Sequence, residues 1–175
     1  GRIVFQGDQI RDANWDYVFF EDVASSPTFL QAGKCAVTYG MQPGFTVEQA
    51  DALQAYLHTS LNDDNVTTWV RLGPELRPKS WAGMRDPVVP LLKALYGHPQ
   101  AGLCWEKYAE KHLFAQGFAA VDGWSSCYFH SELKLFLTMY VDDFLLSGPA
   151  ANMETGWQLI RWGKGTAHVQ DKAVI

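Results

Sequence analysis

The sequence predicts a single α+β domain, and three features carry that prediction. A run from Leu135 to Gly148 is almost wholly apolar, lacks helical spacing and is interrupted by two adjacent aspartates. That pattern indicates two short buried strands joined by a tight turn. Residues 100–116 instead repeat apolar side chains at helical spacing. The 175 residues contain no internal repeat and no linker, so one domain with a real core is the simplest division.

Composition places the chain among globular proteins. Apolar residues make up 47% and charged residues 19%, which is typical of a folded domain rather than a disordered one. Three cysteines stand without a Cys-x-x-Cys pair, which argues against a zinc site or a disulfide framework and suits a reducing compartment. There is no signal peptide, and the longest apolar run is too short to cross a bilayer. Because the chain begins with Gly1 and not Met, we expect a fragment or a processed piece.

Charge is unevenly distributed. The net charge of −5 counts against a stand-alone nucleic-acid-binding protein, which usually has a basic face. The stretch from Arg71 to Lys93 nevertheless holds five basic residues against two acidic ones. It is predicted either to contact phosphates or to be an ordinary solvated loop.

The first half of the chain is expected to alternate short strands and helices. Ser25-Ser26-Pro27 is a typical helix start, and the helix it opens is predicted to end at Gly40. Strand composition, helix formers and Pro-rich stretches predict the remaining elements in order: a strand at residues 2–5, a strand at 45–47 leading into Asp51, a helix at 52–57, a strand at 67–70 and a loop at 71–90.

The second half is dominated by one long helix and the acidic hairpin. Tyr96-Gly97-His98-Pro99 marks a turn before the helix at 100–116, for which Gly117 is a good stop. The expected elements that follow are a strand at 127–129, a turn at 130–132, the hairpin strands on either side of Asp142-Asp143, and a helix from Asn152 to about Gly163.

The two aspartates at the hairpin tip are unusual for their surroundings. Asp is an ordinary turn residue, and a solvated hairpin tip is the simplest interpretation. However, Asp142 and Asp143 are flanked by apolar strands, where two like charges stay ionised only if something positive compensates them. A divalent metal ion is the obvious candidate, because hard cations bind carboxylate oxygens.

Several motifs in the correct order resemble those of reverse transcriptases of copia-type retrotransposons. The unit Tyr140-Val-Asp-Asp143 resembles the family's signature hairpin. The block Leu92-Lys-Ala-Leu-Tyr-Gly97, followed by Gln100-Ala101, Trp105 and Gly117-Phe118, is similar to the region that precedes that hairpin. The stretch from Glu48 to Leu57 resembles the first acidic motif, and Arg2-Ile-Val and residues 20–26 resemble the fingers more weakly.

The resemblance implies a polymerase palm, an antiparallel sheet with helices packed on one face, plus partial fingers. Fingers are expected at about residues 1–50 and 62–95 and the palm at about 45–61 and 96–165, with the thumb and ribonuclease H absent. For Asp51 to meet the 142–143 turn, their strands must be neighbours in that sheet.

The implied activity is RNA-directed DNA synthesis. Two divalent ions, Mg²⁺ or alternatively Mn²⁺, would be held by carboxylates from separate segments. By resemblance, Asp51 and Asp142 are the bridging ligands and Asp143 is a secondary ligand or an orienting charge. Without the hairpin, Asp51 would be interpreted as a helix N-cap. Asp63-Asp64 is interpreted as a turn, and the five histidines as non-ligands.

The roles of other residues are predicted from their positions relative to the family's motifs, and each role has a simpler alternative. Tyr56 would lie under the incoming sugar and reject a ribose 2′-hydroxyl, or else pack under a helix. Gln100 would contact nucleotide or template, or be a solvated first-turn residue. Tyr140 would lie near the primer end, or be a core aromatic. Two further assignments are weaker: Arg2 as a triphosphate-binding residue, although it stands at a chain terminus, and Lys164 as a general acid, although a solvated helix-end lysine is the better interpretation.

The chain also departs from the family's pattern. Where the family usually has Leu-Lys-Gln-Ala-Pro, this chain has His98-Pro99-Gln100-Ala101-Gly102, which removes a lysine expected to contact phosphate. Gln6 stands where a basic fingers residue is frequent.

The resulting hypothesis is a polymerase that uses a template-primer of RNA or DNA and deoxynucleoside triphosphates. Its expected partners are the thumb, ribonuclease H and integrase parts of a Pol polyprotein, with no membrane. The expected location is a cytoplasmic retroelement particle, with the nucleus as the alternative and no secretion. Two rivals remain: an inactive retroelement remnant and a metal-dependent phosphohydrolase, for which no further ligand is evident.

Overall fold

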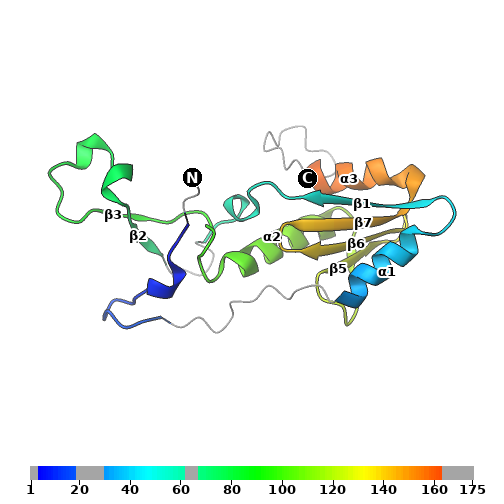
Figure 1. Cartoon of the computed structure of the whole chain (residues 1–175), viewed down its shortest axis with the longest axis horizontal. Coiled ribbons are helices and arrows are strands. Elements are labelled where there is room, and N and C mark those ends of the chain that lie inside the picture. The colour runs from blue at the N-terminus through cyan, green and yellow to red at the C-terminus, as the bar shows by residue number, and fades with distance from the viewer. Residues whose placement is uncertain (1–3, 19–29, 62–66, 163–175) are drawn as a thin grey trace.

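The structure, a computed structural model, describes residues 4–18, 30–61 and 67–162. The molecule is elongated, with a sheet and its helices at one end and a two-stranded ribbon at the other (Figure 1). Among the described residues, no helix is both long enough and apolar enough to cross a membrane.

The main sheet has five strands in the order β1-β7-β6-β5-β4, and every neighbouring pair is antiparallel. At its centre is the acidic hairpin of β6 and β7, with the two aspartates at the turn. The strand bounds are Phe45–Asp51 for β1, Ala119–Ala120 for β4, Cys127–His130 for β5, Leu135–Tyr140 for β6 and Asp143–Pro149 for β7.

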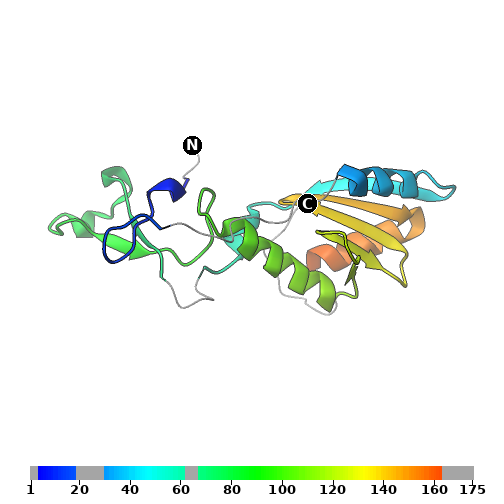
Figure 2. The same cartoon turned by 90° about the horizontal axis from the view of Figure 1, so that it is seen from below.

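Two helices, α2 (Ala101–Ala115) and α3 (Met153–Trp162), cover one face of this sheet, as Figure 2 shows. Strand side chains alternate between faces, so every second residue of β6 and β7 points toward these helices. The buried core is formed by those residues and the inner stripes of both helices, namely Leu135, Leu137, Met139, Phe144, Leu146, Trp105, Ala109, Leu113, Met153, Trp157 and Ile160.

Helix α1 (Leu30–Gly40) packs on the opposite face, over β1, β7 and β6. The Tyr39 ring lies 5.1 Å from that of Phe45 and 6.5 Å from that of Phe129. Gly40 permits close approach to β1, because a Cβ atom there would stand 2.7 Å from the Thr46 carbonyl oxygen. The helix lies toward the Phe45 end of β1, and the acidic end of the sheet remains exposed on this face.

The smaller ribbon pairs β2 (Trp69–Arg71) with β3 (Val88–Pro90). Short 3₁₀ turns complete the described chain at Gly7–Gln9, Ala55–His58, Pro74–Leu76, Lys79–Trp81 and Ala150–Asn152.

Buried His98 connects the ribbon to the start of α2. Its Nδ1 accepts a hydrogen bond from the Gln100 N–H at 3.2 Å. In the neutral ring, Nε2 therefore carries the proton and donates it to Thr68 Oγ1, also at 3.2 Å. The Phe5 N–H donates to the Tyr96 carbonyl at 2.7 Å and brings the N-terminal segment against the same turn.

The structure confirms the palm-type antiparallel sheet, the acidic hairpin, the helix that ends at Gly40 and the long helix. It corrects the helix expected at 52–57, because Gln54 has left-handed backbone dihedrals (φ 54°) and only a 3₁₀ turn follows. It also places β3 inside the expected loop at 71–90 and adds β4, which was not predicted. Val4 and Phe5 are not in a strand, while Arg2 and the helix start at Ser25–Pro27 lie outside the described residues.

Candidate active site

Two aspartates face each other at the exposed end of the sheet. Asp51 is the last residue of β1 and Asp143 the first of β7, and they are partners in the antiparallel ladder. Asp143 also pairs with Tyr140, the last residue of β6. Facing residues of antiparallel strands share one face of the sheet. The side chains of Asp51, Asp143 and Tyr140 therefore form one row, called here the acidic row. It lies on the α1 side of the sheet, beyond the part that α1 covers.

The turn between the strands is held by hydrogen bonds from two directions. The buried Trp105 indole N–H donates to the Val141 carbonyl at 2.6 Å, and the Ala52 N–H donates to the Asp142 carbonyl at 2.7 Å. Val141 has a positive φ of 56°, which is rare for a β-branched residue and costs about 1–3 kcal/mol. The surrounding contacts therefore impose this turn, and they fix the backbone that carries both aspartates.

The carboxyl group of Asp143 is in an electrostatically unfavourable position. A side-chain hydrogen bond with Asp51, burial, and the charges of Asp51 and Asp142 all raise the pKa of Asp143 above its ordinary value. A hydrogen bond with Gln49 lowers that pKa in part. Gln49 lies two residues before Asp51, on the same face of β1. A proton or a cation placed between Asp51 and Asp143 would relieve the repulsion.

Asp142 lies on the other side of the turn, beside two tyrosines. Tyr96 Oη donates to Asp142 Oδ2 at 3.5 Å, a long contact, and the rings of Tyr56 and Tyr96 lie 4.5 Å apart. Burial, followed by the charges of Asp142 and Tyr96, raises the pKa of Tyr56. Tyr56 is therefore close enough to Asp142 to feel its charge, and the role of Tyr56 toward a substrate stays a prediction.

The carboxylate oxygens of these aspartates suit a hard divalent cation, but the described residues do not surround a position for one. Carboxylate oxygens are the ligands that Mg²⁺ prefers. Within residues 4–18, 30–61 and 67–162, no group of three or more His, Cys, Asp or Glu side chains is arranged to hold a metal ion. Asp51 meets Asp143, whereas the sequence suggested Asp51 and Asp142 as the bridging pair. The ligand roles of all three aspartates stay predictions.

Comparison with models of protein families shows which family this chain belongs to. The model of the family described as "Reverse transcriptase (RNA-dependent DNA polymerase)" matches residues 1–159. The chain belongs to the reverse transcriptase family.

Two curated relatives are the truncated transposon Ty1-A Gag-Pol polyprotein and the transposon Ty1-DR5 Gag-Pol polyprotein, both from Saccharomyces cerevisiae. Each is 28% identical over 112 residues, which cover 63% of this chain. The aligned region spans only 8% and 6% of those relatives. No solved structure matches the chain. These findings confirm the predicted kinship with copia-type reverse transcriptases.

The remaining predicted site residues lie in different places. Tyr140 is 54% exposed in the acidic row, so it is not a core aromatic. Gln100 is half-buried immediately before α2, and its side chain does not cap that helix. Arg2, Lys164 and the Asp63-Asp64 pair lie outside the described residues.

Sequence reasoning missed three residues that shape the site. Gln49 was recoverable, because strand alternation places it on the same face as Asp51. Tyr96 stands inside a block that carries the family resemblance, but that block assigns it no contact. Trp105 was expected in the core, and its hydrogen bond to the hairpin turn gives no sequence signal.

Proposed function

We propose that this chain is the fingers-palm core of an RNA-directed DNA polymerase that adds deoxynucleotides to a primer. The observation that carries the proposal is the cross-strand meeting of Asp51 and Asp143 beside the Asp142 turn. The reaction class follows from membership of the family, and the reaction would take place at the exposed acidic row.

The proposed reaction joins the primer 3′-hydroxyl oxygen to the α-phosphorus of a nucleoside triphosphate. The bond between that phosphorus and the pyrophosphate oxygen breaks as the new one forms. Divalent cations bound at the site would lower the pKa of the hydroxyl and stabilise charge on the phosphate oxygens. The three aspartates would hold those cations, and two ions are the number proposed.

The surrounding side chains suggest how the substrates are oriented. Tyr56 is half-buried, its ring lies 4.5 Å from that of Tyr96, and the charge of Asp142 acts on it; in this proposal it would contact the sugar of the incoming nucleotide. Tyr140, exposed in the acidic row, is available to the primer end. The turn that carries Asp142 is fixed by Trp105, so the carboxylates need little reorganisation when substrates bind.

The proposal implies nucleic-acid and nucleotide substrates as well as protein partners. An RNA or DNA template-primer and deoxynucleoside triphosphates are the proposed substrates. The Ty1 relatives are Gag-Pol polyproteins, which supports a parent polyprotein that also supplies thumb, ribonuclease H and integrase parts. A cytoplasmic retroelement particle remains the proposed location.

Magnesium-dependent extension of a DNA primer on an RNA template tests the proposal. The wild-type chain and a longer form that continues into the next part of the polyprotein are compared with Asp142→Asn in each background. We expect extension that Asp142→Asn reduces by at least about 100-fold. Asp122→Asn, at an exposed aspartate in the loop after β4, is the matched control and should retain activity. If neither wild-type form extends the primer, this copy is an inactive remnant and the proposal is wrong.

A further inference from the structure

The turn before α2 directs the side chain of Tyr96 toward the acidic end of the sheet. The half-buried Tyr96 donates from Oη to Asp142 Oδ2 at 3.5 Å, and its ring lies 4.5 Å from that of Tyr56. Polar contacts in active sites are frequently long in the absence of substrate and shorten when the site is occupied. Tyr96 therefore connects the turn before α2 to the carboxyl group at the hairpin turn.

The backbone of Asp142 is fixed separately from its side chain. The Ala52 N–H donates to the Asp142 carbonyl at 2.7 Å, and the Trp105 indole donates to the adjacent Val141 carbonyl at 2.6 Å. Neither bond restrains rotation of the Asp142 carboxyl group. Within residues 4–18, 30–61 and 67–162, the hydrogen bond from Tyr96 is the one that restrains it.

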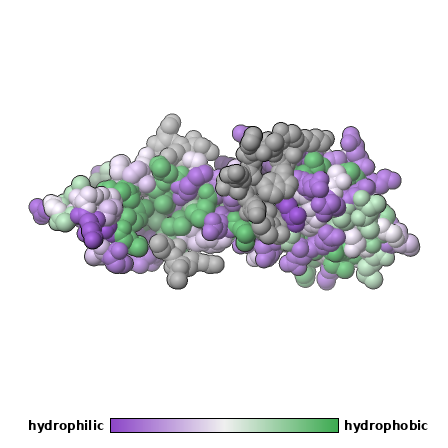
Figure 3. Space-filling view, turned by 90° about the horizontal axis from the view of Figure 1, so that it is seen from above, coloured by the Kyte–Doolittle hydropathy of each residue, from purple (hydrophilic) through white to green (hydrophobic). Residues whose placement is uncertain are grey.

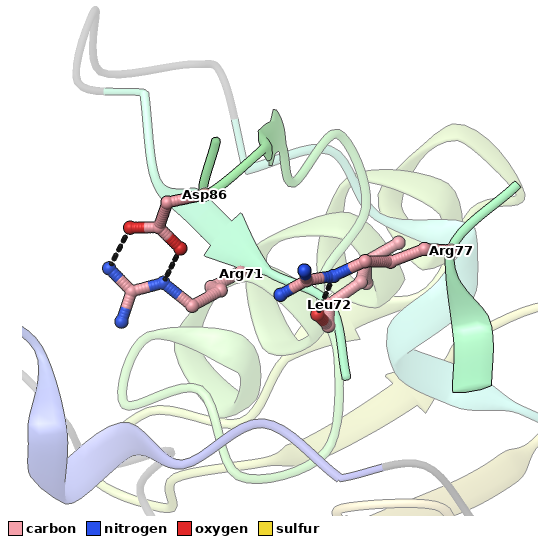
Figure 4. A network of polar contacts seen from close by, with 4 residues as sticks. All are labelled: Arg71, Leu72, Arg77 and Asp86. Carbon is pink, nitrogen blue, oxygen red and sulfur yellow. Dashed lines mark hydrogen bonds and ion pairs between the residues drawn. The ribbon is translucent and has the colours of Figure 1, made fainter. Parts of the chain in front are cut away.

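Tyr96 can orient Asp142 without neutralising it. A basic partner would compete with a cation for the carboxylate, whereas a tyrosine hydroxyl donates a hydrogen bond and carries no positive charge. Among the residues that the structure describes, the one salt bridge joins Arg71 to Asp86 at the ribbon, with Nε 2.6 Å from Oδ1 (Figure 4). The charge of Asp142 thus remains available to a cation.

The N-terminal segment, residues 4–7, holds the backbone of Tyr96 in place. The Phe5 N–H donates to the Tyr96 carbonyl at 2.7 Å. A Cβ atom at Gly97 would overlap the Phe5 carbonyl oxygen, and a Cβ atom at Gly7 would overlap the Gly97 carbonyl oxygen. The two segments therefore cross so closely that both positions require glycine.

This crossing lies where two halves of the molecule meet. The N-terminal segment belongs to the half that contains the β2–β3 ribbon (Figure 1), and Figure 3 shows apolar and charged surface side by side over that half. The Tyr96 side chain instead reaches the palm at Asp142. Tyr96 is thus held from one half of the molecule and contacts the carboxylate of the other.

We propose that Tyr96 is a positioning residue for the polymerase reaction, whose hydroxyl group restrains the Asp142 carboxylate for cation binding. The N-terminal segment keeps Tyr96 in place for this role. Tyr96 acts through Asp142 and needs no contact with primer or nucleotide. The inference rests on the proposed function, because it assigns a role within the same site.

Binding of Mn²⁺, measured as loss of the free-ion electron paramagnetic resonance signal, tests Tyr96 without primer or nucleotide. We expect Tyr96→Phe to weaken Mn²⁺ affinity about three- to fivefold, because it removes one hydrogen bond. That effect should disappear in the Asp142→Asn background, since the hydroxyl acts through this carboxylate. Tyr39→Phe is the matched control: its hydroxyl donates to the Lys134 carbonyl at 3.0 Å, before the start of β6 and away from the turn, so affinity should be unchanged.

Primer extension gives a second measurement that separates positioning from general damage. At low Mg²⁺, Tyr96→Phe should lower kcat about three- to fivefold while KM for the nucleotide stays unchanged. Excess Mg²⁺ should restore the wild-type rate, because it refills a weakened cation site. Thermal melts in EDTA verify that each variant is folded.

A pair of glycine variants tests the contribution of the N-terminal segment. Gly7→Ala should displace the segment from the Gly97 carbonyl and weaken Mn²⁺ affinity at least about twofold, and it should have no further effect in the Tyr96→Phe background. Gly83→Ala is the matched control, because a Cβ atom there meets nothing within 4 Å, and it should bind Mn²⁺ like wild type.

The inference is overturned if the wild-type chain binds no Mn²⁺, if Tyr96→Phe binds it like wild type, or if Tyr96→Phe weakens binding equally in the Asp142→Asn background. Wild-type affinity in Gly7→Ala overturns the role of the N-terminal segment. Absence of primer extension, with a loss of Mn²⁺ affinity in Tyr96→Phe that depends on Asp142, contradicts the polymerase proposal alone. Asp142-dependent extension that Tyr96→Phe leaves unchanged at low Mg²⁺ contradicts this inference alone.

Discussion

Asp51 and Asp143 are direct cross-strand partners at the exposed end of the β1–β7 ladder, and the nearby Asp51 carboxyl group raises the pKa of Asp143. The pair is unfavourable in the metal-free protein, because the second carboxyl group resists ionisation beside the first. A divalent cation between the two carboxyl groups would relieve this repulsion.

Replacing Asp143 by Asn should stabilise the metal-free protein at neutral pH and abolish its response to magnesium. The neutral amide removes a like charge from an exposed cluster, so we expect a rise of about 1–3 °C in melting temperature. Differential scanning fluorimetry with and without Mg²⁺ measures both effects, and Asp122→Asn serves as the control. A magnesium-induced shift that survives in Asp143→Asn would show that Asp143 does not hold the ion.

The pH dependence of metal-free stability should have the opposite sign to that of an ordinary paired carboxylate. The folded-state pKa of Asp143 lies above the unfolded value of about 3.8, so the folded state binds more protons between the two. Stability should therefore fall as pH rises through this window, and Asp143→Asn should remove that fall. Urea denaturation at a series of pH values measures it, and identical profiles for the two proteins would contradict the assignment.

Two buried tryptophans allow the turn to be tested apart from general stability. Trp105 donates to the Val141 carbonyl at the acidic turn, whereas Trp157 donates to Glu48 Oε2, and both bonds are 2.6 Å long. Changing either to Phe should lower the free energy of unfolding by about 2 kcal/mol. Only Trp105→Phe should also weaken magnesium affinity and slow primer extension. Equal effects of both variants on magnesium affinity would mean that Trp105 does not position the turn.

Tyr56 should govern discrimination between deoxyribonucleotides and ribonucleotides if its ring lies under the incoming sugar. Tyr56→Ala should reduce that discrimination at least about tenfold, because it opens space for a 2′-hydroxyl. Tyr56→Phe keeps the ring and should retain discrimination. The ratio of kcat/KM values for the two nucleotide types is the readout, and an unchanged ratio in Tyr56→Ala would assign Tyr56 a packing role.

His98 should make the junction between ribbon and palm sensitive to acid. Burial lowers the pKa of His98 below its ordinary 6.5, and Nδ1 must stay unprotonated to accept the Gln100 N–H. The unfolded state then binds more protons, so stability is complete above pH about 6.5 and falls as the pH decreases toward the folded-state pKa. His98→Gln should flatten this fall in chemical denaturation, with His58→Gln as the control. If His98→Gln leaves the slope of stability against pH unchanged, the acid sensitivity arises from another group.

The sequence predicted the acidic hairpin well because its two strands are short, strongly apolar and separated by an obvious turn. The pairing of β1 with β7 followed from the chemistry, since separate carboxylates can share ions only if their strands are neighbours. Long-range details were not predictable in the same way. Nothing local indicates that Trp105 reaches the turn, that Tyr96 approaches Asp142, or that Val88–Pro90 pairs with a strand across a Pro-rich loop. Likewise, the Ser25-Ser26-Pro27 start and the Gly40 stop predicted a helix here but not the face of the sheet that α1 covers.

Binding of Mn²⁺, followed by electron paramagnetic resonance as loss of the free-ion signal, tests the central claim most directly because it needs neither activity nor a partner. The wild-type chain is compared with Asp51→Asn, Asp143→Asn and the Asp122→Asn control at neutral pH, with Mg²⁺ as competitor. Our account predicts a Mg²⁺-competable site in the wild type and the control that is lost or weakened at least about tenfold in both site variants. Equal Mn²⁺ binding by all four proteins would contradict it.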